Sequence, residues 1–361
     1  MLVSVIIPAI RWDAHLDRAL ASIATQDLPP GVRLEVAVAL AEPTTAPVPT
    51  SVIDGEPVLV VNNPGGSIPV GLNRAVAATS GELVARVDSR CVLPPDYLAR
   101  VVSGLADLTV GAVGGAALVL DRGFLGSAYA VAFNSPLLGP SRYRFSRASG
   151  PTDSSYLGAW RRETLAAVDG FDERLPRNQD NDLAERIQGR GLVVRYDADA
   201  VVGYVAGRSL RGTLRHHYSF GWWRMAQRNQ GGQGLAPRHL AVVAAAATVV
   251  IGASVALARP RSRRRAVAAG AVASGAAALG AWSTAARLRS ARPDLDLAPL
   301  HPLGIAAAPA LAAAADAGWA LGLVRGRRAA GQAPPIHRQG DRQEESAPGR
   351  LRPDRPSPDA G

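Results

Sequence analysis

The sequence predicts an α/β fold in which helices cover both faces of a doubly wound sheet. Short runs rich in Val and Ile, typical of buried parallel strands, alternate with segments whose apolar residues recur at helical spacing, up to about residue 119. Right-handed crossovers place the connecting helices on the two faces of such a sheet. One predicted strand ends directly before a carboxylate, Asp88, at the edge where open α/β sheets bind their ligands.

The predicted elements follow one another along the chain. The amino terminus has no basic leader and Pro8 interrupts its apolar run, so we expect a strand there and not a signal peptide. Strands are predicted over residues 3–7, 34–40, 58–61, 83–87, 193–196 and 200–205. Helices are predicted over residues 13–24, 68–79, 97–105, 161–168 and 210–227, with another that begins at the cap residue Asn178. Residues 121–155 lose periodicity, so we expect a long excursion over the ligand-binding edge.

The composition changes sharply after Pro237. The uncharged apolar run 240–258 has about the length needed to span a bilayer, and 266–286 and 303–324 are weaker candidates dominated by Ala and Gly. We therefore predict an α/β domain over residues 1–236, membrane-associated helices over 237–328 and a disordered tail over 329–361. Ala-rich helices lie near the threshold for insertion, so packing against a soluble partner is the alternative.

The charge distribution favours a membrane over a nucleic acid. The formal net charge is +10, and the arginines crowd the region after Gly207, where the apolar runs begin. Arginines flank residues 240–258 on both sides, which one crossing cannot satisfy, so a re-entrant or interfacial helix is an alternative for this segment. The single cysteine, Cys91, excludes an intrachain disulfide and fits a reducing cytosol. We expect a cell-membrane protein whose α/β domain, residues 1–236, faces the cytoplasm.

Several motifs resemble those of one enzyme family. The segments SVIIPAI, NNPGGSIPVGLNRAV and GELVARVDSRCVLPPDYL are similar to the GT-A catalytic domain of family 2 glycosyltransferases. The later segments YLGAWRRETLAAVDGFDERLPRNQDNDLAERI, GRSLRGTLRHHYSFGWWR, RHL and DAGWALGLVRG resemble the succinoglycan-type (ExoA-like) branch of that family. The resemblance covers residues 1–326 in the family's order and spacing. It implies a Rossmann-like, doubly wound mixed sheet of the GT-A type, followed by membrane helices.

By this resemblance, Asp88-Ser89-Arg90 is the DxD-type motif, which binds the sugar nucleotide and a divalent cation. A carboxylate at a strand end suits Mg²⁺ or Mn²⁺ that bridges phosphates, and the cation would neutralise the diphosphate leaving group. Arg90 stands where the family has Asp or His, and a guanidinium pairs with phosphate instead of a metal. Asp88 is therefore predicted to be the metal ligand and Arg90 a phosphate contact. The alternative is that Asp88 only caps its loop.

Asp180, in Asn178-Gln179-Asp180-Asn181-Asp182, matches the catalytic acid of the family's ED-type motif. An inverting transferase needs a base that takes the proton of the acceptor hydroxyl, and the resemblance assigns that role to Asp180. Asp182 is expected to be structural. The alternative for both is that they complement the helix dipole in its first turn.

The resemblance also implies the substrate contacts. Residues 8–10, from Pro8 to Ile10, are expected to line the base and ribose, and Asn73 and Arg74 to lie near the phosphates. Leu40 stands where the family usually has an Asp for the uracil or ribose, with Glu42 two residues on.

On the acceptor side, Trp160 is expected to stack on a sugar and Arg161 to hold a lipid diphosphate. Trp223 and Arg224 resemble an acceptor-binding motif, and they equally fit an interfacial helix with Trp at the headgroup level.

The sequence therefore predicts a membrane-associated inverting glycosyltransferase. It would use a nucleotide diphosphate sugar and a lipid-linked or growing polysaccharide acceptor, with no nucleic-acid partner. A dinucleotide oxidoreductase is disfavoured because GxGxxG is missing after the first strand. The remaining alternative is a catalytically impaired homologue that binds membranes or nucleic acid through its basic charge.

Overall fold

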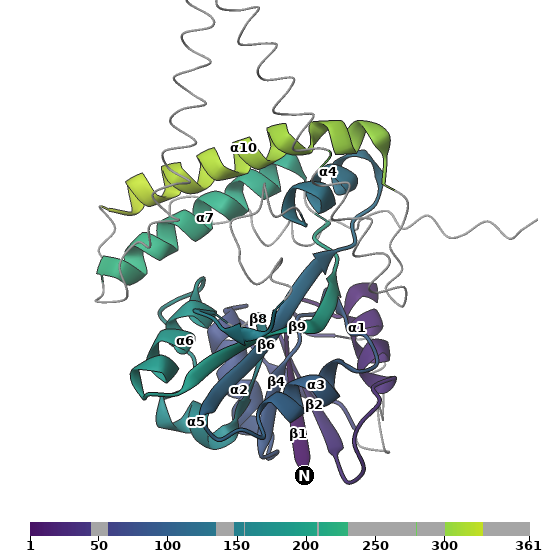
Figure 1. The fold of residues 1–361 in the computed structure, drawn as a ribbon, viewed down its shortest axis with the longest axis vertical. Helices are drawn as coiled ribbons and strands as arrows, with labels where there is room; N and C mark the ends of the chain where they lie inside the picture. The colour runs from purple at the N-terminus through teal and green to yellow at the C-terminus, as the bar shows by residue number, and fades with distance from the viewer. Residues whose placement is uncertain are drawn as a thin grey trace, which may run out of the picture.

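The computed structural model describes residues 1–44, 57–134, 148–154, 156–207, 209–229, 279 and 300–327 (Figure 1). The described residues form a nine-stranded mixed sheet with the order β3-β2-β1-β4-β8-β6-β9-β5, and β7 pairs with β9. The strands are β1 (Leu2–Ala9), β2 (Arg33–Leu40), β3 (Leu59–Asn62), β4 (Leu83–Arg86), β5 (Cys91–Val92), β6 (Val110–Val119), β7 (Gly150–Pro151), β8 (Tyr156–Arg161) and β9 (Val193–Tyr204). The helices are α1 (Ala14–Ala24), α2 (Ile68–Ala78), α3 (Tyr97–Gly104), α4 (Gly123–Phe133), α5 (Arg162–Ala167), α6 (Gln179–Gly189), α7 (Leu210–Asn229) and α10 (Pro302–Gly326).

The first half of the sheet is parallel, as predicted. Strand β1 pairs in parallel with β2 and β4, and β2 with β3, so these strands share one carboxyl edge. Strand β8 then runs antiparallel between β4 and β6. Strand β8 was not predicted, because four consecutive residues of this strand are buried, which removes the alternation that identifies a half-exposed strand.

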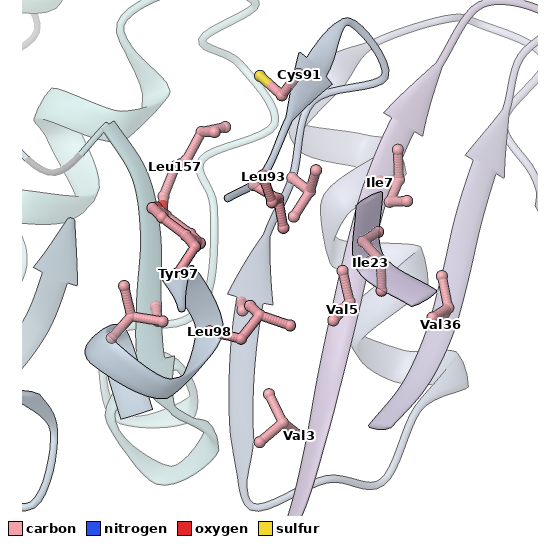
Figure 2. Packing of buried hydrophobic residues seen from close by; sticks show 14 of the residues in the cluster. Val3, Val5, Ile7, Ile23, Val36, Cys91, Leu93, Tyr97, Leu98 and Leu157 are labelled. Carbon is pink, nitrogen blue, oxygen red and sulfur yellow. The ribbon is translucent and has the colours of Figure 1, made fainter. Parts of the chain in front are cut away.

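Helices cover both faces of the sheet. Alternate residues of β1, β2 and β4 pack with α1 and α3 on one face, and Figure 2 shows part of this cluster around Leu93 and Leu98. On the other face, Ile6 and Val84 pack with α2, α5 and α6. Because side chains alternate between the two faces of a strand, Val84 and Arg86 of β4 point to the same face, and Leu83 and Ala85 point to the other.

Two details of the prediction are corrected. The expected excursion over residues 121–155 contains a helix, α4, whose last seven residues are all buried, so its sequence shows no amphipathic period. The two short strands predicted over 193–196 and 200–205 are one strand, β9. Its pairing with β6 shifts register between the Gly114–Tyr196 and Ala116–Val201 pairs, and the polar residues between Tyr196 and Ala200 occupy this irregularity.

Helices α7, α10 and α4 form a layer beyond the carboxyl edge of the parallel strands (Figure 1). The backbones of α7 and α10 approach closely at glycines: a Cβ on Gly322 would lie 2.1 Å from the carbonyl oxygen of Tyr218. Within the described part of the chain, α10 is the one helix long and apolar enough to cross a membrane. It matches the span predicted over 303–324. The spans predicted over 240–258 and 266–286, apart from Leu279, and the tail predicted over 329–361 lie outside the described residues.

Candidate active site

A cavity of about 440 Å³ lies between the carboxyl edge of the parallel strands and α7. Its walls come from the loops after β1, β3 and β4, from the segment before α6, and from α7. Among its lining residues are Pro8, Ile10, Asn63, Asp88, Arg90, Arg177, His216 and Trp223. The cavity is therefore at the edge where the sequence analysis expected a ligand.

Both predicted acids meet at one buried guanidinium, that of Arg86. Its Nε and Nη2 each lie 2.9 Å from Oδ1 of Asp88, and its Nη1 donates to Oδ1 of Asp180. The Arg86 side chain is 5% exposed, whereas those of Asp88 and Asp180 are 25% and 24% exposed. Two carboxylates separated by more than ninety positions in the chain are thus brought together. Asp88 lines the cavity, whereas Asp180 is not among its lining residues and is linked to it through Arg86.

The local sequence explains this convergence. Arg86 has the same parity as Val84, so its side chain leaves β4 on the face that α6 covers. Helix α6 begins after Asn178, whose backbone is left-handed with φ of 64°, a conformation that Asn tolerates better than most residues. Asn178 is thus the cap residue, as predicted, although its side chain makes no cap hydrogen bond. Asp180 then falls in the first turn, directly opposite Arg86.

The environment shifts the protonation of this cluster. Burial raises the pKa of Asp180, the guanidinium of Arg86 lowers it, and the charge of Asp88 raises it again, so the net pKa lies above the ordinary value. Burial alone would lower the pKa of Arg86, but the charges of Asp180 and Asp88 outweigh it and raise that pKa. Asp180 is consequently a better proton acceptor than a solvated carboxylate, which suits a general base.

Asp182 differs from Asp180 in its contacts. Its Oδ2 accepts hydrogen bonds from Arg186 at 2.7 and 2.9 Å, and Arg186 also donates to the carbonyl of Gly170. Asp182 therefore holds Arg186 in the position from which Arg186 attaches α6 to the loop that contains Gly170. These contacts fit the structural role that was predicted for Asp182.

Arg90 lines the cavity and is held by the segment that follows β9. Its Nη1 donates to the carbonyl of Ala206 at 2.8 Å, and Asp121 accepts hydrogen bonds from the amides of Ala206 and Gly207. The loop after β4 and the start of α7 are joined in this way beside Asp88.

The expected nucleotide contacts divide into two groups. Pro8 and Ile10 line the cavity, but Asn73 and Arg74 do not, which corrects their prediction as phosphate contacts. The amide of Asn73 exchanges two hydrogen bonds with the backbone of Phe171 at 2.8 and 2.9 Å, and Arg74 donates to the carbonyl of Asn62. Both fasten segments of the fold to each other instead.

A residue that the sequence analysis did not single out, Asn63, lies in the same part of the cavity. It is 2% exposed, and its Oδ1 has no hydrogen-bond partner among the described residues, while its Nδ2 donates to the carbonyl of Ser67. Its backbone amide donates to the carbonyl of Leu40, the residue that replaces the family's Asp and is itself buried in the apolar core. A buried acceptor thus lies beside the position where an acid was expected.

Most of the predicted acceptor contacts are wrong. Trp160 is 1% exposed, and its ring meets Phe171 edge to face inside the core, so it cannot stack on a sugar. Arg161 pairs with Leu83, at the opposite end of β4 from Asp88, and donates to backbone carbonyls there. Arg224 is ion-paired with Glu185 at 3.4 Å and does not line the cavity.

Trp223 is the one predicted acceptor contact that reaches the cavity. It is buried in the protein, which also excludes a position at the lipid headgroups, and its Nε1 has no hydrogen-bond partner among the described residues. The second tryptophan of the motif, Trp222, is buried as well.

The donor set around Asp88 fits a cation that arrives with phosphates. Within the described ranges, no three His, Cys, Asp or Glu side chains come together as a ready metal site. Arg86 contacts Oδ1 of Asp88 and leaves Oδ2 without a protein partner in the described chain. Mg²⁺ and similar ions are commonly held by one or two carboxylates plus substrate phosphates, so Asp88 alone is sufficient on the protein side.

The parallel strands, the acid after β4 and the acid at the start of α6 form the arrangement that the motif resemblance implies, and the family comparison agrees. Residues 2–219, more than half of the chain, match the family described as glycosyltransferase-like family 2. The chain belongs to this family, and the predicted GT-A α/β fold class is confirmed.

Individual relatives are more distant. The succinoglycan biosynthesis protein ExoA of Rhizobium meliloti (strain 1021) is 26% identical over 193 residues, which are 52% of this chain and 58% of that protein's length. Among solved structures, the mannosyltransferase PcManGT from Pyrobaculum calidifontis, in complex with GDP-Man and Mn²⁺, is 22% identical and covers 87% of this chain and 85% of its own, with a TM-score of 0.48. Residues 1–349 of S. aureus TarS are 16% identical and cover 62% of this chain and 65% of their own, with a TM-score of 0.43.

Proposed function

We propose that this protein transfers a sugar, with inversion, from a nucleotide diphosphate sugar to a hydroxyl of a lipid-linked or growing polysaccharide acceptor. The observation that carries the proposal is the convergence of Asp88 and Asp180 on Arg86 at the edge of the cavity. One acid lies beside the loops that line the donor region, and the other begins the helix that packs next to α7.

Asp180 is the catalytic base. Its Oδ2 has no partner in the described chain, and its raised pKa favours uptake of the acceptor's hydroxyl proton. The deprotonated oxygen attacks the anomeric carbon from the face opposite the diphosphate, and the diphosphate leaves. Inversion follows from this single displacement.

Asp88 is the metal ligand. A bound Mg²⁺ or Mn²⁺ would supply positive charge to the diphosphate as its bond to the sugar breaks. Arg90 contributes a second positive charge from the same loop and pairs with phosphate oxygens. Pro8, Ile10 and Asn63 line the other end of the cavity, where the buried Oδ1 of Asn63 would accept a hydrogen bond from a base or ribose.

The acceptor enters from the α7 side, where Trp223 and His216 line the cavity. The apolar helix α10 packs on α7 and supports attachment to the cell membrane, with the catalytic domain on the cytoplasmic side. A membrane-bound acceptor would then be delivered next to Asp180.

The experiment is a donor screen with detergent-solubilised full-length protein. UDP- and GDP-sugars are incubated with Mn²⁺ and membrane extract as the acceptor source, and nucleotide release and labelled lipid product are measured. Transfer that is lost in Asp180→Asn supports the proposal. Salt-sensitive nucleic-acid binding without transfer or donor hydrolysis would support the binding-protein alternative instead.

A further inference from the structure

Arg86 is the one residue in the described chain that contacts both catalytic-site acids, and no step of the proposed reaction uses it. We propose that Arg86 is a positioning residue that holds the metal-binding acid Asp88 and the base Asp180 as one unit at a set separation. The inference rests on the proposed function and adds to it a residue that does not touch substrate.

The contacts are divided between the atoms in a specific way. Arg86 donates a hydrogen bond from Nε to Oδ1 of Asp88, with Nη2 ion-paired to the same oxygen, and another from Nη1 to Oδ1 of Asp180. Neither carboxylate bonds any other described side chain or backbone amide through its side chain. Each acid therefore commits one oxygen to Arg86 and keeps Oδ2 for the reaction, so the guanidinium plane determines where both reactive oxygens point.

Burial makes this arrangement rigid. The Arg86 side chain is 5% exposed, while the two acids are about five times as exposed, and Asp88 also lines the cavity. Strand β4 ends at Arg86, Asp88 lies in the loop directly after it, and α6 contributes Asp180. Arg86 therefore also joins two parts of the fold whose relative position sets the distance from donor to base. A group this buried acts through the acids and not on the substrate.

Charge balance explains why the residue is an arginine. Two carboxylates next to each other repel, and a cation between them removes the penalty for keeping both ionised. A guanidinium presents its N–H groups in a planar fork and bonds both acids at once, whereas a lysine ammonium is a point charge that cannot hold two carboxylates in set orientations. Arg86→Lys keeps the charge and removes the fork, so it separates geometry from charge.

The first test compares Arg86→Lys with a matched control, Arg162→Lys. Arg162, the first residue of α5, is also partly buried, but it lies near the amino end of β4, away from Asp88. It donates to the carbonyl of Gly81, just before β4, and to that of Val76 in α2. We expect Arg86→Lys to lower kcat about 100-fold per folded molecule, because misplacement of a reacting group by an ångström has an effect of this size. The KM for the donor should change less than kcat. Arg162→Lys should lower thermal stability with kcat within about twofold of wild type.

The second test does not depend on turnover and covers the case in which Arg86→Lys fails to fold. Asp180→Asn is compared with the double variant Asp180→Asn/Arg86→Gln, in which one acid and its countercharge are removed together. Binding of Mn²⁺ with UDP or GDP is measured by electron paramagnetic resonance. We expect Asp180→Asn to bind like wild type and the double variant to bind about tenfold more weakly, because Asp88 has lost the group that orients it.

The outcomes are distinguishable. If wild type transfers sugar and Arg86→Lys keeps kcat within threefold, or if the double variant binds as tightly as Asp180→Asn, the positioning role of Arg86 is overturned. If wild type and Arg162→Lys both lack transfer with every donor, the proposed function fails, and the binding comparison still decides whether Arg86 orients Asp88.

Discussion

The two ends of strand β4 both hold buried or half-buried arginines, but they use them differently. At the amino end, Arg161 donates to backbone carbonyls, and Arg162 donates to backbone carbonyls and to the hydroxyls of Ser4 and Thr79, which are neutral acceptors. The carboxylate there, that of Glu163, lies 3.4 Å from Nε of Arg161 and is 79% exposed to solvent. At the carboxyl end, Arg86 is buried and pairs with two carboxylates that remain about a quarter exposed to solvent, one of which, Asp88, lines the cavity. The comparison shows that one end joins strands and loops, while the other keeps unsatisfied charge ready for a ligand.

The energetic consequence follows from this difference. Guanidinium bonds to carbonyls that would otherwise be buried without partners stabilise the fold. A cluster of one cation and two anions leaves a net negative charge in a partly buried place, which is destabilising unless a phosphate-bound cation or a proton arrives. Substitutions at the two ends of β4 should therefore separate function from stability.

The largest expected effect comes from Asp180→Asn. We expect transfer to fall by about a thousandfold, the size of a typical general-base contribution, because the amide cannot take the hydroxyl proton. Thermal unfolding should show equal or higher stability, because a repulsive buried charge next to Asp88 is removed. Initial rates and melting curves of the same preparation test this, and turnover close to wild type would refute the base assignment.

A second large effect is expected for Asp88→Asn. The rate should fall on the order of 100-fold, and the dependence on Mn²⁺ concentration should flatten, because the amide oxygen is a weaker ligand and carries no charge. Rate measured against metal concentration gives the answer. An unchanged metal dependence would mean that Asp88 only caps its loop.

Arg162→Ala should produce the opposite profile at the amino end of β4. Loss of its hydrogen bonds to the carbonyls of Gly81 and Val76 should lower the free energy of unfolding by about 2–3 kcal/mol. The donor KM and the kcat per folded molecule should stay near wild type. Denaturant titration with parallel kinetics measures both, and a selective loss of kcat would break the comparison between the two ends.

The smallest effect is on the pH profile. Because the pKa of Asp180 is raised, the folded protein holds its proton to a higher pH than the unfolded chain, whose Asp titrates near 3.9. The acid limb of kcat should therefore lie above about pH 4. The stability contributed by this proton is fully present below the unfolded pKa and is lost as the pH rises through the folded pKa.

Melting curves at several pH values, with Asp180→Asn as the control that lacks the proton, measure this contribution. Identical pH dependences of wild type and Asp180→Asn would contradict the assignment of the raised pKa.

Local sequence patterns were sufficient to predict most helices and strands of the first half of the chain and to single out Asp88 and Asp180. The apolar runs of β1 to β4 and the helical spacing of α1 to α3 are properties of short segments, and Asp88 and Asp180 stand at positions in motifs that the chain itself displays. Helix α4 and strand β8 were missed because burial on all sides erases the polar–apolar period on which such prediction depends.

The tertiary structure alone decided what each side chain contacts. Trp160 and Arg161 have the chemistry of an acceptor site, but β8 runs antiparallel beside β4. This direction places Trp160 in the core and Arg161 at the amino end of β4, away from the cavity. Asn73 hydrogen-bonds the backbone of Phe171, because the fold brings the segment after α5 next to α2. Nothing in the sequence marks Arg86 as a site residue. The packing of α6 on the face of the sheet to which Arg86 points makes it the link between two acids more than ninety residues apart. Residue type determines what a side chain can bond, and only the path of the backbone determines which partner it meets.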